Sequence, residues 1–296
     1  MSHPRASVGA VTEVAEKTEL LLAGTLSPSR AADFKSCPLV YRFRSVDKLP
    51  QRPTPDKARG TLVHAVLDRL FDLPGAERTY DRAAALVEPE WARLAEAEPE
   101  TAALFAEGGL AEWLDSARRM IAGYFALEDP SRLEPAAREQ LVEAVLDIGD
   151  AAPLGLRGYV DRLDVAPTGE VRVVDYKTGA IPREAYEAKA LFQLKFYALV
   201  LWRTQGTVPH QLKLMYLADR DTLTYRPDAA ELERFERTLV AVWRAIERAV
   251  TRRDFRANPS RLCDWCDYQA LCPPHGGTLP PYPEPVEPAA DASEQL

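Results

Sequence analysis

Long apolar runs are missing from this chain of 296 residues. No stretch of about 18 apolar residues occurs, so we expect no membrane-spanning helix. The first residues, Met1–Pro4, have neither the basic start nor the apolar stretch of a secretory signal, which predicts a cytoplasmic location. A P-loop of the form Gly-x-x-x-x-Gly-Lys-Ser/Thr is also missing, so the chain encodes no ATPase motor of that type.

Positive charge is scarce in the chain as a whole. There are 37 Lys and Arg against 45 Asp and Glu, a net charge of −8, which argues against a protein that coats nucleic acid non-specifically. Two segments depart from this average: 26–60 has eight basic and three acidic residues, and 243–261 has six arginines and two acidic residues. Each segment is either a phosphate-binding surface or an ordinary solvated face, and the charges alone do not decide between them.

The composition predicts a folded domain, because 46% of the residues are hydrophobic and 28% are charged. Residues 1–24 are weakly patterned and are interpreted as an N-terminal arm. Residues 25–276 form the expected domain, with a helical insertion at about 75–130. The stretch 277–296 is acidic and rich in proline, so we expect it to be disordered.

Hydrophobic periodicity indicates where helices and strands lie. The turn signal Ala166–Gly169 separates two apolar stretches, so residues 156–176 are expected to form a β-hairpin. Helices are predicted at 28–36, 59–73, 80–97, 110–127, 188–203 and 229–253, and strands at 140–148, 156–165, 171–176 and 211–217.

Four short motifs follow one another along the chain. Each motif alone is a weak signal, since a pattern such as Asp-x-Lys in a strand occurs by chance in many proteins. Together they supply a histidine, two acidic ligands and a lysine, a set that can build a metal-dependent phosphodiesterase site. The motifs are Gly60-x-x-x-His64, Gly158-x-x-Asp161-Arg162-x-Asp164, Asp175-Tyr176-Lys177-Thr178-Gly179 and Gln193-x-x-x-Tyr197.

The predicted hairpin brings the acidic motifs together. Asp175 and Lys177 lie two residues apart and share one face of a strand, and cross-strand pairing can bring Asp161 beside them. Two neighbouring carboxylates repel unless a cation lies between them, and hard oxygen ligands favour Mg²⁺ or Mn²⁺. His64 would add a nitrogen ligand. Lys177 would orient or deprotonate the attacking water, or neutralise the charge that develops on the phosphate.

Each motif also has a purely structural interpretation. The Asp-x-Lys pair can be a surface ion pair, and His64 can be a satisfied histidine on the apolar face of a helix. Arg162 with its two neighbouring aspartates can form a salt-bridge ladder, and Gln193 and Tyr197, one helical turn apart, can simply line a helix. The predicted function would be excluded only if all of these structural interpretations were correct together.

Only four cysteines occur, and three of them are close together in the sequence. Cys263, Cys266 and Cys272 have the spacing C-x₂-C-x₅-C, and Cys37 stands far upstream. In a cytosolic chain, clustered cysteines bind metal more often than they form disulfides. Four thiolates suit either Zn²⁺ or a [4Fe–4S] cluster, and spacing alone favours zinc as the commoner occupant.

The four motifs resemble those of the RecB-type branch of the PD-(D/E)XK nucleases, over residues 26 to about 273. The resemblance implies an α/β fold with a restriction-endonuclease-like core, in which helices flank a mixed central sheet, and an added helical insertion. No member of the core set is missing, so an active enzyme is expected. The implied metal ligands are His64, Asp161, Asp175 and the Tyr176 carbonyl, and the implied catalytic residues are Asp161, Asp175, Lys177, Gln193 and Tyr197.

The resemblance also reverses the preference for zinc. RecB-like nucleases of the AddB and CRISPR-associated type have one cysteine before the histidine motif and a C-x₂-C-x₅-C after the last helix, and these residues hold a structural [4Fe–4S] cluster. Cys37, Cys263, Cys266 and Cys272 match that pattern. If such a cluster joins the ends of the domain, the two basic segments converge beside it. Trp265, Phe43 or Tyr41 could then stack on bases, although packing around the cluster is the favoured role for Trp265.

The sequence therefore predicts a metal-dependent DNA nuclease, an exonuclease of DNA repair or recombination that uses Mg²⁺ or Mn²⁺ and carries a [4Fe–4S] cluster. The expected partner is DNA, either single-stranded or at duplex ends, with a helicase or repair partner in trans. The alternative is a non-catalytic nucleic-acid-binding or assembly module of a repair or CRISPR complex. A zinc-bound regulator is a weaker third interpretation.

Overall fold

The computed structural model describes residues 25–149, 152–180 and 184–283. The expected N-terminal arm and residues 284–296 of the expected tail lie outside this range. The chain divides into two compact units. The first contains residues 53–243 with the stretch before Arg30, and the second combines Arg30–Arg52 with the stretch from Arg244 onward.

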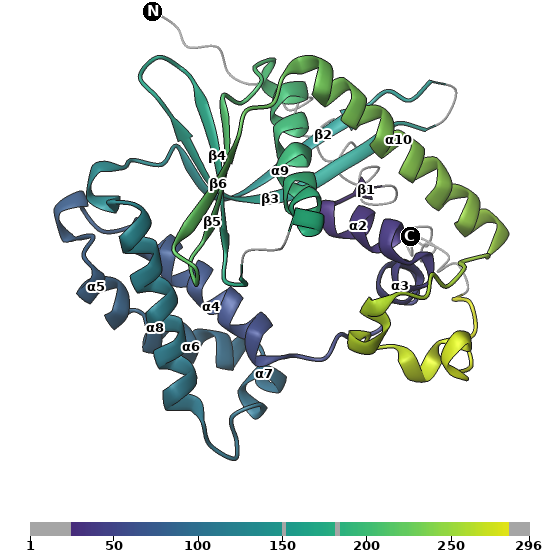
Figure 1. The fold of residues 1–296 in the computed structure, drawn as a ribbon, viewed down its shortest axis with the longest axis horizontal. Helices are drawn as coiled ribbons and strands as arrows, with labels where there is room; N and C mark the ends of the chain where they lie inside the picture. Colours follow the sequence, from purple (N-terminus) through teal and green to yellow (C-terminus); the bar gives the residue numbers. More distant parts are fainter. Residues whose placement is uncertain (1–24, 150–151, 181–183, 284–296) are drawn as a thin grey trace, which may run out of the picture. The chain divides into compact units, whose positions relative to one another are not determined.

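A six-stranded mixed sheet forms the centre of the first unit (Figure 1). Its strands are β1 (Thr25–Leu26), β2 (Ala137–Leu146), β3 (Leu154–Val165), β4 (Val171–Lys177), β5 (Gln211–Tyr216) and β6 (Asp221–Tyr225). Strands β3 and β4 form the predicted antiparallel hairpin, and β2 pairs antiparallel with β3. Strand β5 lies parallel to β4 and antiparallel to β6, while β1 pairs in parallel with β3.

The helices are α2 (Pro28–Ser36), α3 (Pro38–Tyr41), α4 (Pro55–Leu70), α5 (Tyr80–Ala85), α6 (Val87–Ala97), α7 (Pro99–Ala103), α8 (Leu110–Leu127), α9 (Glu184–Gln205) and α10 (Ala229–Arg252). Helices flank the mixed sheet, which confirms the predicted fold class. Among the residues that the structure describes, no helix is both long and apolar enough to cross a membrane.

Helix boundaries differ from the prediction where a local signal was missed. Helix α4 begins at Pro55, before the predicted start at residue 59, because Thr54 caps it: its hydroxyl accepts a hydrogen bond from the Lys57 N–H at 3.3 Å. The predicted helix 80–97 is two helices that meet at Leu86. Strands β1 and β6 were not predicted.

The main apolar core lies between the sheet and helices α4, α5, α6 and α8, which form the lower left of Figure 1. Helix α4 contributes a continuous buried face, and each of its large side chains stabilises the fold by roughly 1.5–3 kcal/mol through burial. Strand β4 contributes Val174 and Tyr176 to the same core. The buried apolar face of α4 comprises Leu62, Val63, Val66, Leu67 and Leu70.

The second unit is held together by aromatic contacts between its two stretches of chain. Tyr41 stacks on Phe255 with ring centroids 6.4 Å apart, and the Phe43 and Tyr268 centroids are 5.1 Å apart. Tyr41 and Phe43 are only 2% and 1% exposed, so neither can serve as a platform for bases. Trp265 was expected to pack around the cluster, but its side chain is 86% exposed.

Gly123 in α8 provides a test of how closely that helix approaches the sheet. A Cβ at this position would lie 1.9 Å from the Leu217 carbonyl oxygen. Alanine is intrinsically better than glycine in a helix by about 1 kcal/mol, yet we expect Gly123→Ala to lower the free energy of unfolding by about 2–3 kcal/mol because of this clash. Urea unfolding followed by circular dichroism measures the change.

Gly60→Ala in α4 is the matched control, since its Cβ would meet only the Thr178 hydroxyl, at 3.3 Å. It should stay within about 1 kcal/mol of the wild type. Equal stability of the two variants would contradict the close packing of α8.

Candidate active site

Strand β4 sends alternate side chains to opposite faces of the sheet. Val174 and Tyr176 enter the core against α4 and α8, so Asp175 and Lys177 belong to the other face. There the Lys177 ammonium lies 2.6 Å from Asp175 Oδ2, and Asp175 is 1% exposed. The Asp-x-Lys pair is therefore not a surface ion pair.

Lys177 is fixed by the glutamine and tyrosine of helix α9. Its ammonium donates to Gln193 Oε1 at 2.9 Å, and the Gln193 amide donates to the Tyr197 hydroxyl, also at 2.9 Å. Gly158 makes room for this arrangement, because a Cβ there would lie 2.6 Å from Tyr197 Cε1. Burial alone would lower the pKa of Lys177, but the charge and hydrogen bond of Asp175, together with Asp161 and Tyr216, raise that pKa above its usual value.

Asp161 reaches the same place from strand β3. The hairpin pairs Arg162 with Val174, and this register brings Asp161 alongside Asp175. Asp161 Oδ2 accepts a hydrogen bond from the Tyr176 N–H at 2.8 Å. Burial, and then the neighbouring charge of Asp175, raise the pKa of Asp161 to about 7.

His64 comes to the site from helix α4 and is not a buried core histidine. Its side chain is 28% exposed, its Nε2 lies 3.0 Å from the Tyr176 carbonyl oxygen, and its Nδ1 lies 3.4 Å from Asp161 Oδ2. Gly60, one turn earlier, lets the helix approach Thr178 just past the end of β4. This close approach gives the Gly-x-x-x-His spacing a physical reason.

Arg162 and Asp164, from the same motif as Asp161, form a structural network instead. Arg162 is 1% exposed and donates to the Tyr176 hydroxyl at 2.9 Å. It also pairs with Glu128 at 2.8 Å, while Asp164 pairs with both Arg162 and Arg172. The salt-bridge interpretation thus holds for Asp164 and not for Asp161.

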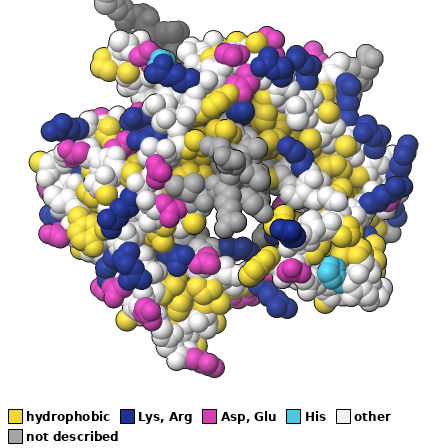
Figure 2. All heavy atoms as spheres, viewed as in Figure 1, with side chains coloured by type: hydrophobic (Ala, Val, Ile, Leu, Met, Phe, Trp, Pro, Cys, Tyr) yellow, Lys and Arg dark blue, Asp and Glu magenta, His cyan; other side chains and the backbone are white. Residues whose placement is uncertain are grey.

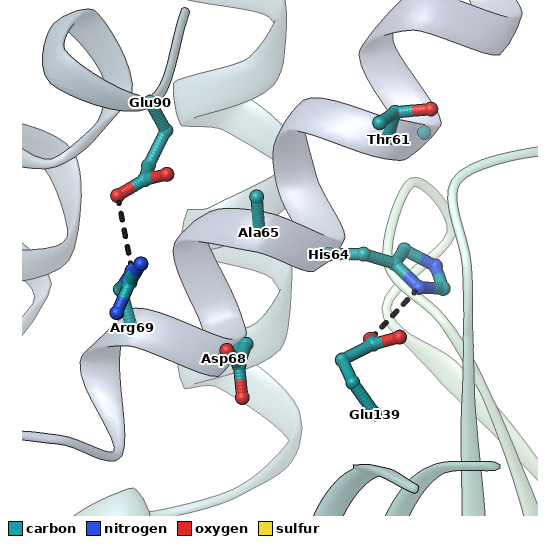
Figure 3. Close-up of a pocket in the computed structure, with 8 residues that line it drawn as sticks. Thr61, His64, Ala65, Asp68, Arg69, Glu90 and Glu139 are labelled. Carbon is teal, nitrogen blue, oxygen red and sulfur yellow. Dashed lines mark ion pairs between the residues drawn. The ribbon is translucent and has the colours of Figure 1, made fainter. Parts of the chain in front are cut away.

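A further acidic residue, Glu139 of strand β2, was missed by the sequence analysis. Glu139 Oε1 lies 3.8 Å from His64 Nδ1, at the edge of a cavity of about 550 Å³ that runs along α4 (Figure 3). The only signal for it was strand register, because Glu139 stands between residues that pair with Arg162 and Val160. The predicted strand began one residue too late to include it. The cavity is lined by Gly60, Thr61, His64, Ala65, Asp68, Arg69, Glu90 and Glu139.

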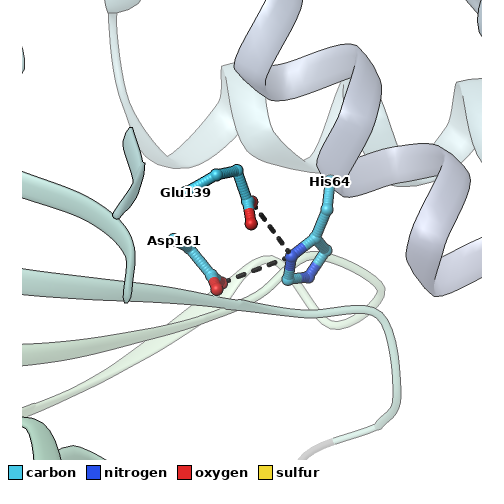
Figure 4. A group of neighbouring side chains, drawn as sticks. All are labelled: His64, Glu139 and Asp161. Carbon is cyan, nitrogen blue, oxygen red and sulfur yellow. Dashed lines mark ion pairs between the residues drawn. The ribbon is translucent and has the colours of Figure 1, made fainter. Parts of the chain in front are cut away.

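His64, Glu139 and Asp161 have ligand atoms within 4.8 Å of one another (Figure 4). Within the described ranges, no other group of three or more His, Cys, Asp or Glu side chains gathers this closely. The structure therefore brings the histidine, the carboxylates and the lysine of the four motifs to one place.

The four cysteines all belong to the second unit and are free thiols. No three of their sulfurs lie within 4.8 Å of one another in the described chain. The Cys37 sulfur accepts a hydrogen bond from the Asn258 N–H at 3.3 Å, and the Cys263 sulfur accepts one from the Ser260 N–H at the same distance. The pKa of Cys272 is raised by burial and then by the charges of the other three thiols.

The raised pKa of Asp161 predicts how the stability of the metal-free protein depends on pH. The folded chain holds this proton up to pH about 7, whereas an unfolded aspartate releases it near pH 4. Stability from this group is therefore lost as pH rises from about 4 to about 7. Between pH 5.5 and 8 we expect the free energy of unfolding in EDTA to fall by about 2 kcal/mol more in the wild type than in Asp161→Asn. Urea titrations at both pH values test this, and equal falls would refute it.

Comparisons with known proteins agree with this geometry. Residues 25–273 match the family model of the PD-(D/E)XK nuclease superfamily. The chain is 24% identical to the Gene 69 proteins of Mycobacterium phages D29 and L5, in each case over 83% of this chain and at least 95% of the relative. A crystal structure of a candidate exonuclease from Eubacterium rectale has the same fold, with a TM-score of 0.51 at 12% identity over 90% of this chain and 94% of that one. The chain belongs to the PD-(D/E)XK nuclease superfamily.

Proposed function

We propose that this chain is a RecB-type, metal-dependent DNA exonuclease that acts in DNA repair or recombination. The observation that carries the proposal is the meeting of Asp161, Asp175 and Lys177 at the end of the β3–β4 hairpin, with His64 beside them. The superfamily supports phosphodiester hydrolysis, and the exonuclease character is suggested by the Eubacterium rectale protein.

The residues of the site fit a divalent cation. Asp175 is buried, and its Oδ2 lies 2.6 Å from the Lys177 ammonium. A divalent cation would relieve the repulsion between these neighbouring carboxylates, and carboxylate and carbonyl oxygens with one imidazole suit Mg²⁺ or Mn²⁺. Asp161, Asp175, His64 and the Tyr176 carbonyl would hold the ion, which supplies Lewis-acid activation of the scissile phosphate and the attacking water.

The chain's own contribution to the reaction centres on Lys177. Its ammonium is held between Asp175 and Gln193, so it carries a positive charge at a fixed point beside the carboxylates. From there it orients the attacking water and stabilises the negative charge that grows on the phosphate in the transition state. Gln193 and Tyr197 act as positioning residues, because they fix the side chain of Lys177.

A DNA substrate is favoured by the exposed face of helix α10. The buried side of this amphipathic helix carries Leu232, Leu239 and Ile246, and its arginines lie on the solvent side. Figure 2 shows basic side chains along the upper right edge, where α10 runs in Figure 1. We infer that these arginines contact the phosphates of DNA, since the net charge of the chain as a whole is negative. The exposed arginines are Arg234, Arg237, Arg244, Arg248 and Arg252.

Replacement of Lys177 tests the proposed chemistry. We expect Lys177→Ala to slow Mn²⁺-dependent digestion of end-labelled DNA by about a hundredfold or more, while DNA affinity stays close to that of the wild type. Gel assays with single-stranded DNA, duplex DNA and RNA measure cleavage, and fluorescence anisotropy measures binding. Lys195→Ala on α9 is the matched control, since Lys195 pairs with Glu231 at 2.7 Å and is similarly exposed.

Cleavage that persists in both Lys177→Ala and Asp161→Ala would contradict the site. A wild-type chain that binds DNA and never cuts it with Mg²⁺ or Mn²⁺ would instead favour the non-catalytic alternative.

We also propose that Cys37, Cys263, Cys266 and Cys272 hold a structural [4Fe–4S] cluster. Support comes from their place in one compact unit and from the N–H groups that donate to the Cys37 and Cys263 sulfurs, a common feature around iron–sulfur clusters.

Iron and sulfide analysis of anaerobically purified protein tests the cluster. The wild type should be brown, with about four iron atoms per chain, and Cys263→Ser should be colourless and poorly soluble. Lys177→Ala, which leaves every cysteine in place, should keep the colour. Zinc without iron in the wild type, or a brown and folded Cys263→Ser, would refute the proposal.

A further inference from the structure

Glu139 reaches the candidate metal site from an element that carries none of the four motifs. It lies on strand β2, directly across from Asp161, since the flanking pairs are Arg138 with Arg162 and Gln140 with Val160. Its Oε1 is 3.8 Å from His64 Nδ1, and Asp161 Oδ2 is 3.4 Å from the same nitrogen. Figure 4 shows both carboxylates directed at the imidazole edge.

The hydrogen bonding of His64 determines what Nδ1 can do. Nε2 lies 3.0 Å from the Tyr176 carbonyl, which can only accept, so the imidazole proton belongs on Nε2. In the neutral ring, Nδ1 then presents a lone pair to two carboxylate oxygens. Three electron-rich atoms that converge in this way repel one another unless a proton or a metal cation lies among them.

The surroundings add negative charge. Asp175 is 1% exposed, and its Oδ2 lies 2.6 Å from the Lys177 ammonium. Lys177 pairs with Asp175, and no ion pair between it and Glu139 or Asp161 is present in the described chain.

The backbone of Glu139 is in the left-handed region, with φ of 42°, which is uncommon for a residue other than glycine. This conformation costs roughly 1–2 kcal/mol relative to an ordinary strand residue. Glycine would adopt it without that cost. A change of Glu139 to glycine therefore removes the carboxylate without destabilising the fold.

We propose that Glu139 is a ligand for the divalent ion of this nuclease and binds it together with His64 and Asp161. The inference rests on the proposed function and extends the ligand set that the family resemblance implies. It assigns to β2 a direct part in the metal site.

Direct measurement of Mn²⁺ binding tests the proposal without reference to cleavage. Metal-free full-length protein is titrated with Mn²⁺, and the free ion is followed by electron paramagnetic resonance. We expect Glu139→Gln and Glu139→Gly to weaken Mn²⁺ binding about tenfold or more, and Glu139→Asp, which keeps a carboxylate, to weaken it less. Glu139→Gly should melt no lower than the wild type without metal, which separates lost binding from lost folding.

Glu143→Gln is the matched control, since Glu143 lies on the same strand and pairs with Arg157 at 3.6 Å. It should bind Mn²⁺ like the wild type. Wild-type affinity in both Glu139→Gln and Glu139→Gly would overturn the assignment of Glu139, while DNA cleavage by the wild type would leave the proposed function standing. A wild-type chain that neither binds Mn²⁺ nor cuts DNA would overturn both.

Discussion

Strand β4 packs Val174 and Tyr176 into the core on one face and presents Asp175 and Lys177 on the other. The position of every candidate catalytic group depends on this division. Tyr176 anchors the strand, because its ring packs in the core and its hydroxyl accepts a hydrogen bond from buried Arg162. With the side chain fixed, the backbone on either side of Tyr176 is fixed as well. Its N–H donates to Asp161 and its carbonyl accepts from His64, so one residue positions two candidate metal ligands from different elements.

Charge balance separates this site from the ion-pair network beside it. The carboxylates of Glu128 and Asp164 are matched by Arg162 and Arg172, so that network is compensated within the fold and stabilises it without a ligand. At the site, three carboxylates share Lys177 and a histidine that holds its proton toward a carbonyl. Burial, and then the charge of Asp175, raise the pKa of Asp161. A fold keeps such an uncompensated cluster at the cost of stability, which is the pattern of a functional site.

The sequence could predict the parts of the site that are encoded locally. The i, i+2 spacing of Asp175 and Lys177, the hairpin turn and the helical i, i+4 spacing of Gln193 and Tyr197 each follow from the geometry of one element. Glu139 could not be found in this way, since its role depends on the register between β2 and β3 and on a backbone conformation that no pattern signals. The exposure of Trp265 and the burial of Tyr41 and Phe43 also depend on tertiary packing. Residue type alone does not determine this exposure, and the sequence analysis therefore favoured a packed Trp265 and allowed an exposed Tyr41 or Phe43.

The second unit has a weaker basis for stability than the first. It is built from two stretches that residues 53–243 separate, and closing so long a loop carries an entropic cost. Its described core is small, and aromatic contacts supply much of it. A small core assembled from distant stretches gains most from a cross-link, and ligands at Cys37 and at the three later cysteines would provide one. The candidate catalytic residues lie in the first unit, whose core is larger, so the proposed role of the cysteines is in stability and that of the carboxylates is in chemistry. The buried apolar residues of the second unit are Ala31, Leu39, Tyr41, Phe43, Ile246, Phe255 and Tyr268.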